Sequence, residues 1–195
     1  MKPTLDAHYW QTRYQEQNTP WDMGQVSPPL RHYIDQLEDK DIRILIPGAG
    51  RAYEAAYLHQ RGFRHVYVCD WADAAFAWLR MQVPDFPRAH QLTEDFFDLA
   101  IEVDLIMEQT FFCAIDPDDR PAYAEQAADL LAEAGKLVGL FWATEFAEGP
   151  PYGGHLSEYR TLFRPYFRIV YADISPYSIP PRAGRELFLE LVKKS

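Results

Sequence analysis

Short, continuous apolar runs recur along the chain from residue 41 onward. Three of them, at 43–46, 66–69 and 103–107, have the length and composition of strands that are buried on both faces of a sheet. A fourth run at 137–142 is of the same kind. These runs predict the strands of a central sheet with both faces covered.

Stretches with helical spacing separate these runs. The first lies at 52–61, and Asp73 is positioned to cap a second. A third begins at Asp116 and runs to about Ala134, with Gly135 closing it. Repeated strand–helix units predict parallel strands, right-handed crossovers and helices on both faces.

Two late runs, at 167–174 and 186–192, are separated by a proline-rich loop without a helical pattern. They predict an antiparallel hairpin at the sheet edge. The whole pattern predicts an α/β, Rossmann-like fold with a mostly parallel sheet. In such sheets a ligand binds beyond the carboxyl ends of the strands, so the residues that follow each strand are the first candidates for a site.

Residues 1–40 have a different character. Tyr and Trp side chains stand there among polar residues, with turn signals at 19–20 and 27–29. This composition predicts a helical, loop-rich arm laid against a core of residues 41–195, and not a second domain. The length of 195 residues also fits a single domain.

Composition and charge exclude several classes of protein. The formal net charge of −10 argues against a nucleic-acid partner, because duplex DNA and RNA repel such a surface. No stretch approaches the roughly 18 apolar residues of a membrane helix, and residues 1–6 have no signal-peptide pattern. Cys69 and Cys113 lie apart in apolar surroundings, which predicts no metal site, no disulfide framework and a cytoplasmic location.

The sequence Gly48-Ala49-Gly50 follows the first strand. Glycine permits a tight turn and a close approach of the backbone to a ligand. A dinucleotide-binding turn has a third glycine three residues later, and here Tyr53 stands at that position. The turn therefore favours a nucleotide-type ligand other than a nicotinamide dinucleotide, with a purely structural turn as the alternative.

Asp70 follows the second strand, and Trp71 stands beside it. A carboxylate at this place can accept hydrogen bonds from both hydroxyls of a ribose. The alternative is that Asp70 caps the next helix, a role for which Asp73 is better placed.

Further candidates lie on either side of the third strand. Asp95 can accept a hydrogen bond from an adenine amino group and Phe96 can stack on the base, although both residues also fit an ordinary surface-to-core boundary. Gln109 directly follows the third strand. Phe111 and Phe112 come next and predict an apolar pocket wall, with core packing as the alternative for at least one of them.

Ordered blocks of the sequence resemble the thiopurine methyltransferase family, most closely the branch of halide and thiol methyltransferases. The blocks, which cover nearly the whole chain in order, lie at 9–24, 46–52, 95–97, 108–117, 149–152 and 179–184. The resemblance implies S-adenosylmethionine as cofactor and a small-molecule methyl acceptor as partner. Tyr14 and Gln109 depart from some relatives, which have tryptophan and tyrosine there.

By position, the resemblance implies a cofactor site in which the arm packs over the ligand. Glycines of the first turn would face its methionine end, and Asp70 would face its ribose. The implied cofactor-binding set is Trp10, Tyr14, Trp21, Gly48, Ala49, Gly50, Asp70, Trp71, Asp95, Phe96 and Gln109. Aromatic rings suit this ligand, because its sulfonium is a cation and each ring attracts it by ~0.5–2 kcal/mol.

Methyl transfer from a sulfonium is a direct displacement, so we expect positioning and not a catalytic triad. Side chains that can orient or deprotonate an acceptor are Glu108, Asp116, Arg120, His155 and Arg182, and Arg120 equally fits a solvated helix position. The expected pocket walls are Phe111, Phe112, Trp142 and Tyr152.

Such a pocket favours thiols, sulfide, selenide, halides or heteroaromatic thiols. The competing hypotheses are a nicotinamide-dependent oxidoreductase on a similar sheet and a catalytically silent cofactor-binding protein.

Overall fold

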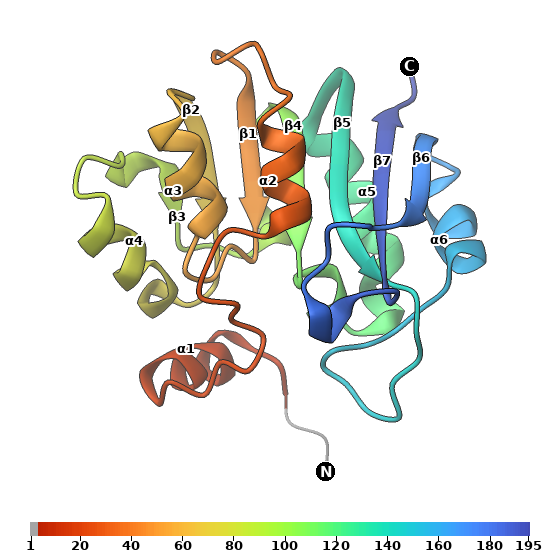
Figure 1. Ribbon diagram of the computed structural model, residues 1–195, viewed down its shortest axis with the longest axis horizontal. Coiled ribbons are helices and arrows are strands. Elements are labelled where there is room, and N and C mark those ends of the chain that lie inside the picture. The colour runs from red at the N-terminus through yellow and green to blue at the C-terminus, as the bar shows by residue number, and fades with distance from the viewer. Residues whose placement is uncertain (1–3) are drawn as a thin grey trace.

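The six strands expected from the apolar runs and one unpredicted short strand, β3, form a single seven-stranded sheet (Figure 1), in the order β3-β2-β1-β4-β5-β7-β6. This computed structural model describes residues 4–195. Its strands are β1 Arg43–Pro47, β2 His65–Cys69, β3 Gln91–Leu92, β4 Val103–Gln109, β5 Leu131–Trp142, β6 Phe167–Ile174 and β7 Glu186–Lys193. Its helices are α1 Ala7–Gln15, α2 Pro28–Ile34, α3 Tyr53–Gln60, α4 Ala77–Gln82, α5 Arg120–Leu130 and α6 Leu156–Phe163.

The pairing of strands confirms the predicted fold class. β1 pairs in parallel with β2 and β4, β2 with β3, and β4 with β5. β7 is antiparallel to both β5 and β6, so the expected C-terminal hairpin lies at the sheet edge. The loop between its strands contains only a single 3-10 turn at Pro180–Arg182.

Successive side chains of the central strands enter two separate cores. Ile44 and Ile46 of β1 pack on the face covered by α2, α3 and α4, whereas Leu45 packs on the face of α5 and α6. All three are at most 4% exposed. Each such side chain contributes about 1.5–3 kcal/mol on burial, which is why these strands are continuous apolar runs.

The helix predicted from Asp116 ends earlier than expected, and the closure at Gly135 is wrong. α5 stops at Leu130, and Leu131 already pairs with Val103 of β4. Ala134 then takes left-handed backbone (φ 58°) in an irregular stretch before the regular pairing resumes. Strand pairing at this point overrides the helix propensity of an alanine-rich segment.

Two helices lie where no separate helix was expected. α2 falls inside the predicted arm, but Leu30 and Ile34 are at most 1% exposed and belong to the core. α6 contributes Tyr159 and Phe163 to the opposite core. The segment that lies outside the core layers is therefore 4–27, which includes α1.

The carboxyl ends of the parallel strands meet at one rim of the sheet. α1, the loop that follows β5 and the 3-10 turn Pro180–Arg182 all lie along this rim, at the bottom of Figure 1. Among residues 4–195, no helix has the length and apolarity needed to cross a membrane.

Candidate functional site

The turn between β1 and α3 is built on left-handed backbone. Gly48 and Gly50 both have φ near 54°, and Ala52 follows at 59°. A Cβ atom added at Gly48 would lie 2.7 Å from Cβ of Phe111, so the ring of Phe111 packs directly on this glycine. The lack of a side chain at Gly48 therefore makes room for the Phe111 ring at the point where β1 ends.

Asp70 secures the same turn from the end of β2. Its carboxylate accepts hydrogen bonds from the N–H of Gly50 at 3.1 Å and of Ala72 at 2.9 Å, and the residue is 9% exposed. Burial raises the pKa of this carboxyl to about 6, although the two N–H donors lower it. Asp70 thus combines the local turn role with a position at the site.

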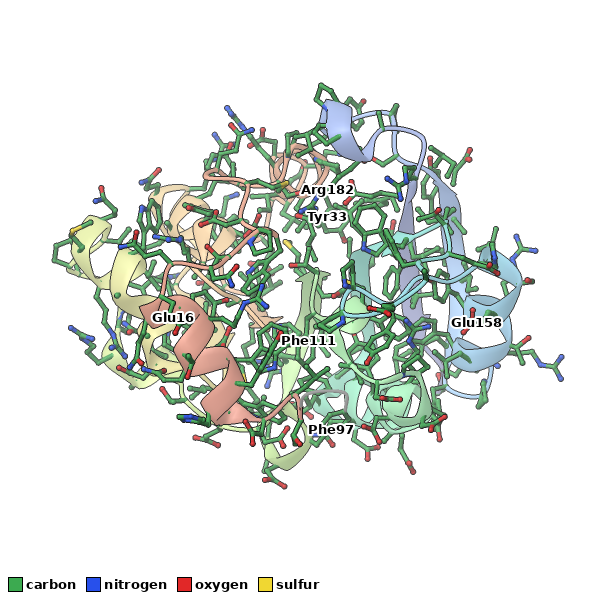
Figure 2. The ribbon with its side chains drawn as sticks, turned by 90° about the horizontal axis from the view of Figure 1, so that it is seen from below. Glu16, Tyr33, Phe97, Phe111, Glu158 and Arg182 are labelled. Carbon is green, nitrogen blue, oxygen red and sulfur yellow. The ribbon has the colours of Figure 1, made fainter. Side chains whose placement is uncertain are left out.

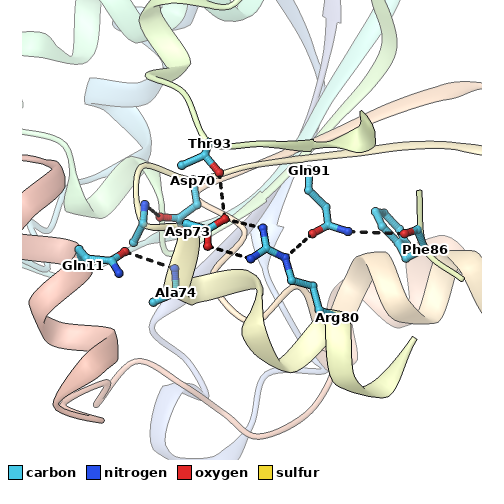
Figure 3. Close-up of polar contacts among 9 residues, drawn as sticks. Gln11, Asp70, Asp73, Ala74, Arg80, Phe86, Gln91 and Thr93 are labelled. Carbon is cyan, nitrogen blue, oxygen red and sulfur yellow. Dashed lines mark hydrogen bonds and ion pairs between the residues drawn. The ribbon is translucent and has the colours of Figure 1, made fainter. Parts of the chain in front are cut away.

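The capping role predicted for Asp73 is wrong. Its carboxylate pairs with Arg80 and accepts a hydrogen bond from Thr93 (Figure 3), and no side chain in the described part of the chain caps the 3-10 turn that begins there. The N–H of Ala74 instead donates to the side-chain oxygen of Gln11 at 3.2 Å. This bond fastens α1 beside the turn that follows β2.

Three rings of the arm form an aromatic roof, defined here as Trp10, Tyr14 and Trp21. Trp21 contacts Trp10 and Tyr14 edge-on, at centroid distances of 5.5 and 5.9 Å. The guanidinium of Arg13 lies 5.0 Å from the ring of Trp21, and its Nε donates to the carbonyl of Asn18. Trp10, Arg13 and Tyr14 share one face of α1 because they are three and four residues apart.

A cavity of about 710 Å³ lies between this roof and the strand ends. Eight of the eleven predicted cofactor residues line it: Trp10, Tyr14, Trp21, Gly48, Asp70, Trp71, Asp95 and Phe96. Ala49, Gly50 and Gln109 line a smaller adjoining pocket instead. The structure therefore brings together residues from the arm and from three different strand ends.

Figure 2 looks onto this rim and shows Phe111 near its middle, with Phe97 and Arg182 on opposite sides. Of the expected pocket walls, Phe111, Trp142 and Tyr152 line the cavity. We call the part of the cavity beside Asp70, Asp95 and Phe96 the Asp70 end. The part beside Trp142 and Tyr152 is the Tyr152 end. The N–H of Tyr152 donates to the carbonyl of Cys113 at 2.6 Å, which holds the loop after β5 against the turn after β4.

Phe112 does not form a pocket wall, contrary to the prediction. It is 2% exposed and packs edge-on against Phe141 and Tyr159 in the core. Phe111 and Phe112 thus divide the two roles that the sequence left open. One faces the cavity and the other anchors the turn.

Arg120 lies behind the cavity, neither solvated nor in contact with it. It is 3% exposed, and its guanidinium lies 4.6 Å from the ring of Phe112. It donates to the carbonyls of Tyr152 and Gly153 and pairs with Glu158 at 3.3 Å. The interpretation of Arg120 as a solvated helix residue is therefore wrong, and its guanidinium instead holds the loop at Tyr152 and Gly153.

Arg182 lines both pockets and joins distant parts of the chain. Its guanidinium pairs with Glu186 at 3.2 Å and donates to the backbone carbonyl of Trp21 at 2.9 Å. Gln109 also donates to Glu186, at 3.3 Å. Arg182 thereby bonds the C-terminal loop to the arm, and Glu186 at the start of β7 links it to the end of β4.

The remaining orienting candidates lie in different places. Asp116 lines the cavity and its carboxylate caps the following 3-10 turn. His155 is exposed, contacts Glu145 and does not reach the cavity. Glu108 is fully buried behind the cavity wall. Among residues 4–195, no three His, Cys, Asp or Glu side chains gather as a metal site requires.

Several residues that line the cavity were not predicted. They include Arg13, Glu94, Phe97, Thr110, Ile115, Pro150 and Pro181. The helical spacing from Trp10 was enough to find Arg13. The others depend on how loops from separate parts of the chain meet, and no local pattern shows this.

Comparison with known proteins gives the chain its family. The family model described as "Thiopurine S-methyltransferase (TPMT)" matches residues 5–179. Thiocyanate methyltransferase 1 of Arabidopsis thaliana is 31% identical over 190 residues, covering 94% of this chain and 83% of the relative. Probable thiol methyltransferase 2 of the same plant is 32% identical, covering 91% and 81%.

A bacterial relative and solved structures extend the comparison. Thiopurine S-methyltransferase of Acinetobacter baylyi is 26% identical, covering 82% of this chain and 84% of the relative. Magnesium protoporphyrin IX methyltransferase from Synechocystis, solved with bound SAM, aligns with a TM-score of 0.71 and 16% identity over 100% of both chains. That likeness shows the fold. The sequence matches go further: the chain belongs to the thiopurine S-methyltransferase family and is an S-adenosylmethionine-dependent methyltransferase.

Proposed function

We propose that this methyltransferase acts on a small, soft nucleophile, foremost a thiol or sulfide, and that the two ends of its cavity hold donor and acceptor. The observation that carries the proposal is the continuity of the cavity. One space of about 710 Å³ runs from Asp70 under the aromatic roof to Trp142 and Tyr152. Donor and acceptor can therefore meet without a large movement of the fold.

The residues at the Asp70 end fit S-adenosylmethionine. Gly48 makes room for the ring of Phe111. The Asp70 carboxylate suits a ribose diol, and Asp95 and Phe96 suit an adenine. The rings of Trp10, Tyr14 and Trp21 suit a cationic sulfur. When bound, this cofactor supplies an electrophilic methyl group.

The chain's own residues bind, orient and exclude water. The arm is bonded at both sides of the cavity, through Gln11 to Ala74 and through the carbonyl of Trp21 to Arg182. Closure of this kind holds two reactants in line and strengthens electrostatic attraction inside. No general base is needed for an acceptor that arrives as an anion.

The Tyr152 end favours polarisable acceptors. Phe111, Trp142 and Tyr152 give it aromatic walls, while Asp116 and Arg182 supply polar groups. Burial raises the pKa of the Cys113 thiol to about 12, so this thiol stays protonated beside the cavity. Thiols, sulfide, selenide, halides and heteroaromatic thiols all fit, and the relatives named for thiocyanate, thiol and thiopurine support the soft-nucleophile class.

Turnover across an acceptor panel tests the proposal. The panel is sulfide, an alkyl thiol, thiocyanate, iodide and a heteroaromatic thiol, with the alcohol that matches the alkyl thiol as control. We expect S-adenosylhomocysteine to form with at least one sulfur acceptor and not with the alcohol. Cofactor binding without product from any soft nucleophile would support the silent cofactor-binding alternative instead.

We also propose that the chain works as one domain in the cytoplasm, without a nucleic-acid partner. The packing of α2 into the core and the bonds from the arm to the rim support a single unit. Both cysteines are free and buried, which is compatible with a reducing compartment. The net charge of −10 supports the absence of a nucleic-acid partner.

A further inference from the structure

Glu108 is a fully buried carboxyl at the end of β4, directly behind the cavity wall. It is 0% exposed and does not line the cavity. Its Oε2 accepts hydrogen bonds from the backbone N–H of Phe111 at 3.2 Å and of Phe112 at 3.0 Å. Its Oε1 has no hydrogen-bond partner among residues 4–195.

The turn that Glu108 holds has strained backbone. Thr110, a β-branched residue, stands there in left-handed backbone with φ 67°. The Sγ of Cys113 donates to the carbonyl of Thr110 at 3.4 Å, which closes the turn from the other side. Such a conformation persists only where surrounding contacts determine it, and the two bonds to Glu108 are contacts of that kind.

This turn, residues 109–113, touches both ends of the cavity. The ring of Phe111 packs on Gly48 at the Asp70 end, where an added Cβ would clash with it. The carbonyl of Cys113 accepts from the N–H of Tyr152 at the other end. A displacement of the turn would therefore alter both ends of the cavity at the same time.

We infer that Glu108 is a positioning residue, which fixes the turn 109–113 and thereby sets the donor and acceptor ends of the cavity relative to each other. This inference rests on the proposed function, because it takes these ends as the places of cofactor and acceptor. Glu108 acts through the backbone of Phe111 and Phe112 and touches neither ligand. Its essential property is a fixed oxygen that accepts hydrogen bonds. It does not need to exchange a proton with the methyl acceptor.

The surroundings of Glu108 agree with that role. Gly139 of β5 lies against its side chain, where a Cβ would come within 2.9 Å of Cγ. The titratable groups coupled to its charge are Glu186 of β7, Tyr123 of α5, Cys113 of the turn and Tyr159 of α6. Burial raises the pKa of the Glu108 carboxyl to about 7, and the charge of Glu186 adds to this. Protonated or ionised, the carboxyl keeps an oxygen that accepts the two N–H groups.

Three variants separate positioning from proton transfer: Glu108→Gln, Glu108→Ala and Glu108→Ala with Thr110→Gly. For each, we would measure S-adenosylhomocysteine affinity by calorimetry, kcat and KM for the best thiol, the pH profile and thermal unfolding. We expect Glu108→Ala to lose at least tenfold in kcat/KM and several-fold in affinity, because both ends shift. Glu108→Gln should stay within about threefold of the wild type, with an unchanged pH profile.

Glycine adopts φ near 67° without strain, so Thr110→Gly should restore part of both losses in the Glu108→Ala background. If Glu108→Gln is as impaired as Glu108→Ala, the carboxyl is needed as a proton acceptor and the inference is overturned. Wild-type values for Glu108→Ala would also overturn it. Should Glu108→Ala fail to fold, Glu108→Gln decides alone. Failure of the wild type to bind S-adenosylhomocysteine would count against the proposed function and not against this inference.

Discussion

At the scale of single residues, two buried acids show how similar side chains reach different roles. Asp70 directly follows β2 and Glu108 is the second-last residue of β4, and both accept backbone N–H groups of the next turn. Only Asp70 lines the cavity. The difference comes from the turn after each strand, which leaves Asp70 at the rim and folds Phe111 and Phe112 over Glu108.

Asp70→Ala should weaken S-adenosylhomocysteine binding by about 1.5–3 kcal/mol, because charge-assisted hydrogen bonds are lost. Asp70→Asn keeps an acceptor for one of the two backbone donors and should lose less. Calorimetry on both variants measures the effect. An unchanged affinity in Asp70→Ala would remove this residue from the site.

Glu108 also gives the stability of the protein a dependence on pH. Its pKa is raised to about 7 in the folded state, from 4.5, so the folded state binds more protons in this interval. The free energy of unfolding therefore falls as pH rises from about 4.5 to about 7. Glu108→Gln removes this loss. Between pH 5 and pH 8, the free energy of unfolding of Glu108→Gln should therefore rise relative to that of the wild type, on the order of 2–3 kcal/mol. Denaturant unfolding at several pH values measures this, and parallel curves for the two proteins would contradict it.

At the scale of elements, the turn between β1 and α3 depends on two separate properties of Gly48. One is its left-handed backbone, and the other is the space that Phe111 occupies. Gly24 shares the first property without the second, because its φ is 70° and no atom of residues 4–195 lies within 4 Å of an added Cβ. Substitutions of Gly48 and Gly24 therefore make a matched comparison, in which both strain the backbone and only the first adds a steric clash.

Gly48→Ala should weaken cofactor binding and lower the free energy of unfolding by about 1–3 kcal/mol more than Gly24→Ala does, because only Gly48 adds a steric clash to the backbone strain. Calorimetry and denaturant unfolding of both variants measure the difference. Equal losses would show that the backbone conformation alone matters and that Phe111 moves aside freely.

The elements also show how far the sequence could predict this fold. The runs at 43–46, 66–69 and 103–107 were predictable as strands because buried parallel strands are continuously apolar. The end of α5 was not, because the pairing of Leu131 with Val103 across the sheet decides it. α6 has only Tyr159 and Phe163 fully buried along eight residues, a pattern too short to recognise.

The candidate site divides in the same way. Spacing after strands located Gly48 and Asp70, because strand ends share one rim. It failed for Arg120 and Phe112, whose burial depends on carbonyls and rings contributed by distant loops. Contacts of this kind leave no periodic trace in the sequence.

At the scale of the whole molecule, one cavity unites the arm, the strand ends and the C-terminal loop. A ligand that fills it contacts all three parts and binds the folded state alone. Ligand binding should therefore appear as a gain in global stability and not only as a local change.

S-adenosylhomocysteine at one hundred times its Kd should add about 2.7 kcal/mol of stability, and raise Tm by ~5–10 °C for a domain of this size. NAD should leave Tm unchanged, because the family match excludes the nicotinamide alternative. Trp21→Ala should show a smaller rise at the same ligand concentration. A rise with NAD, or none with S-adenosylhomocysteine, would contradict the assignment.

The bond from Arg182 to the arm reaches the backbone carbonyl of residue 21, and not its indole ring. This one bond is thus independent of which side chain stands at that position. A change of the indole can therefore weaken the hold on the cofactor while the C-terminal loop keeps its bond to the arm. A shorter or neutral side chain at position 182 would remove this bond whatever ring residue 21 carries, and would leave the bond between Gln11 and Ala74 to hold the arm.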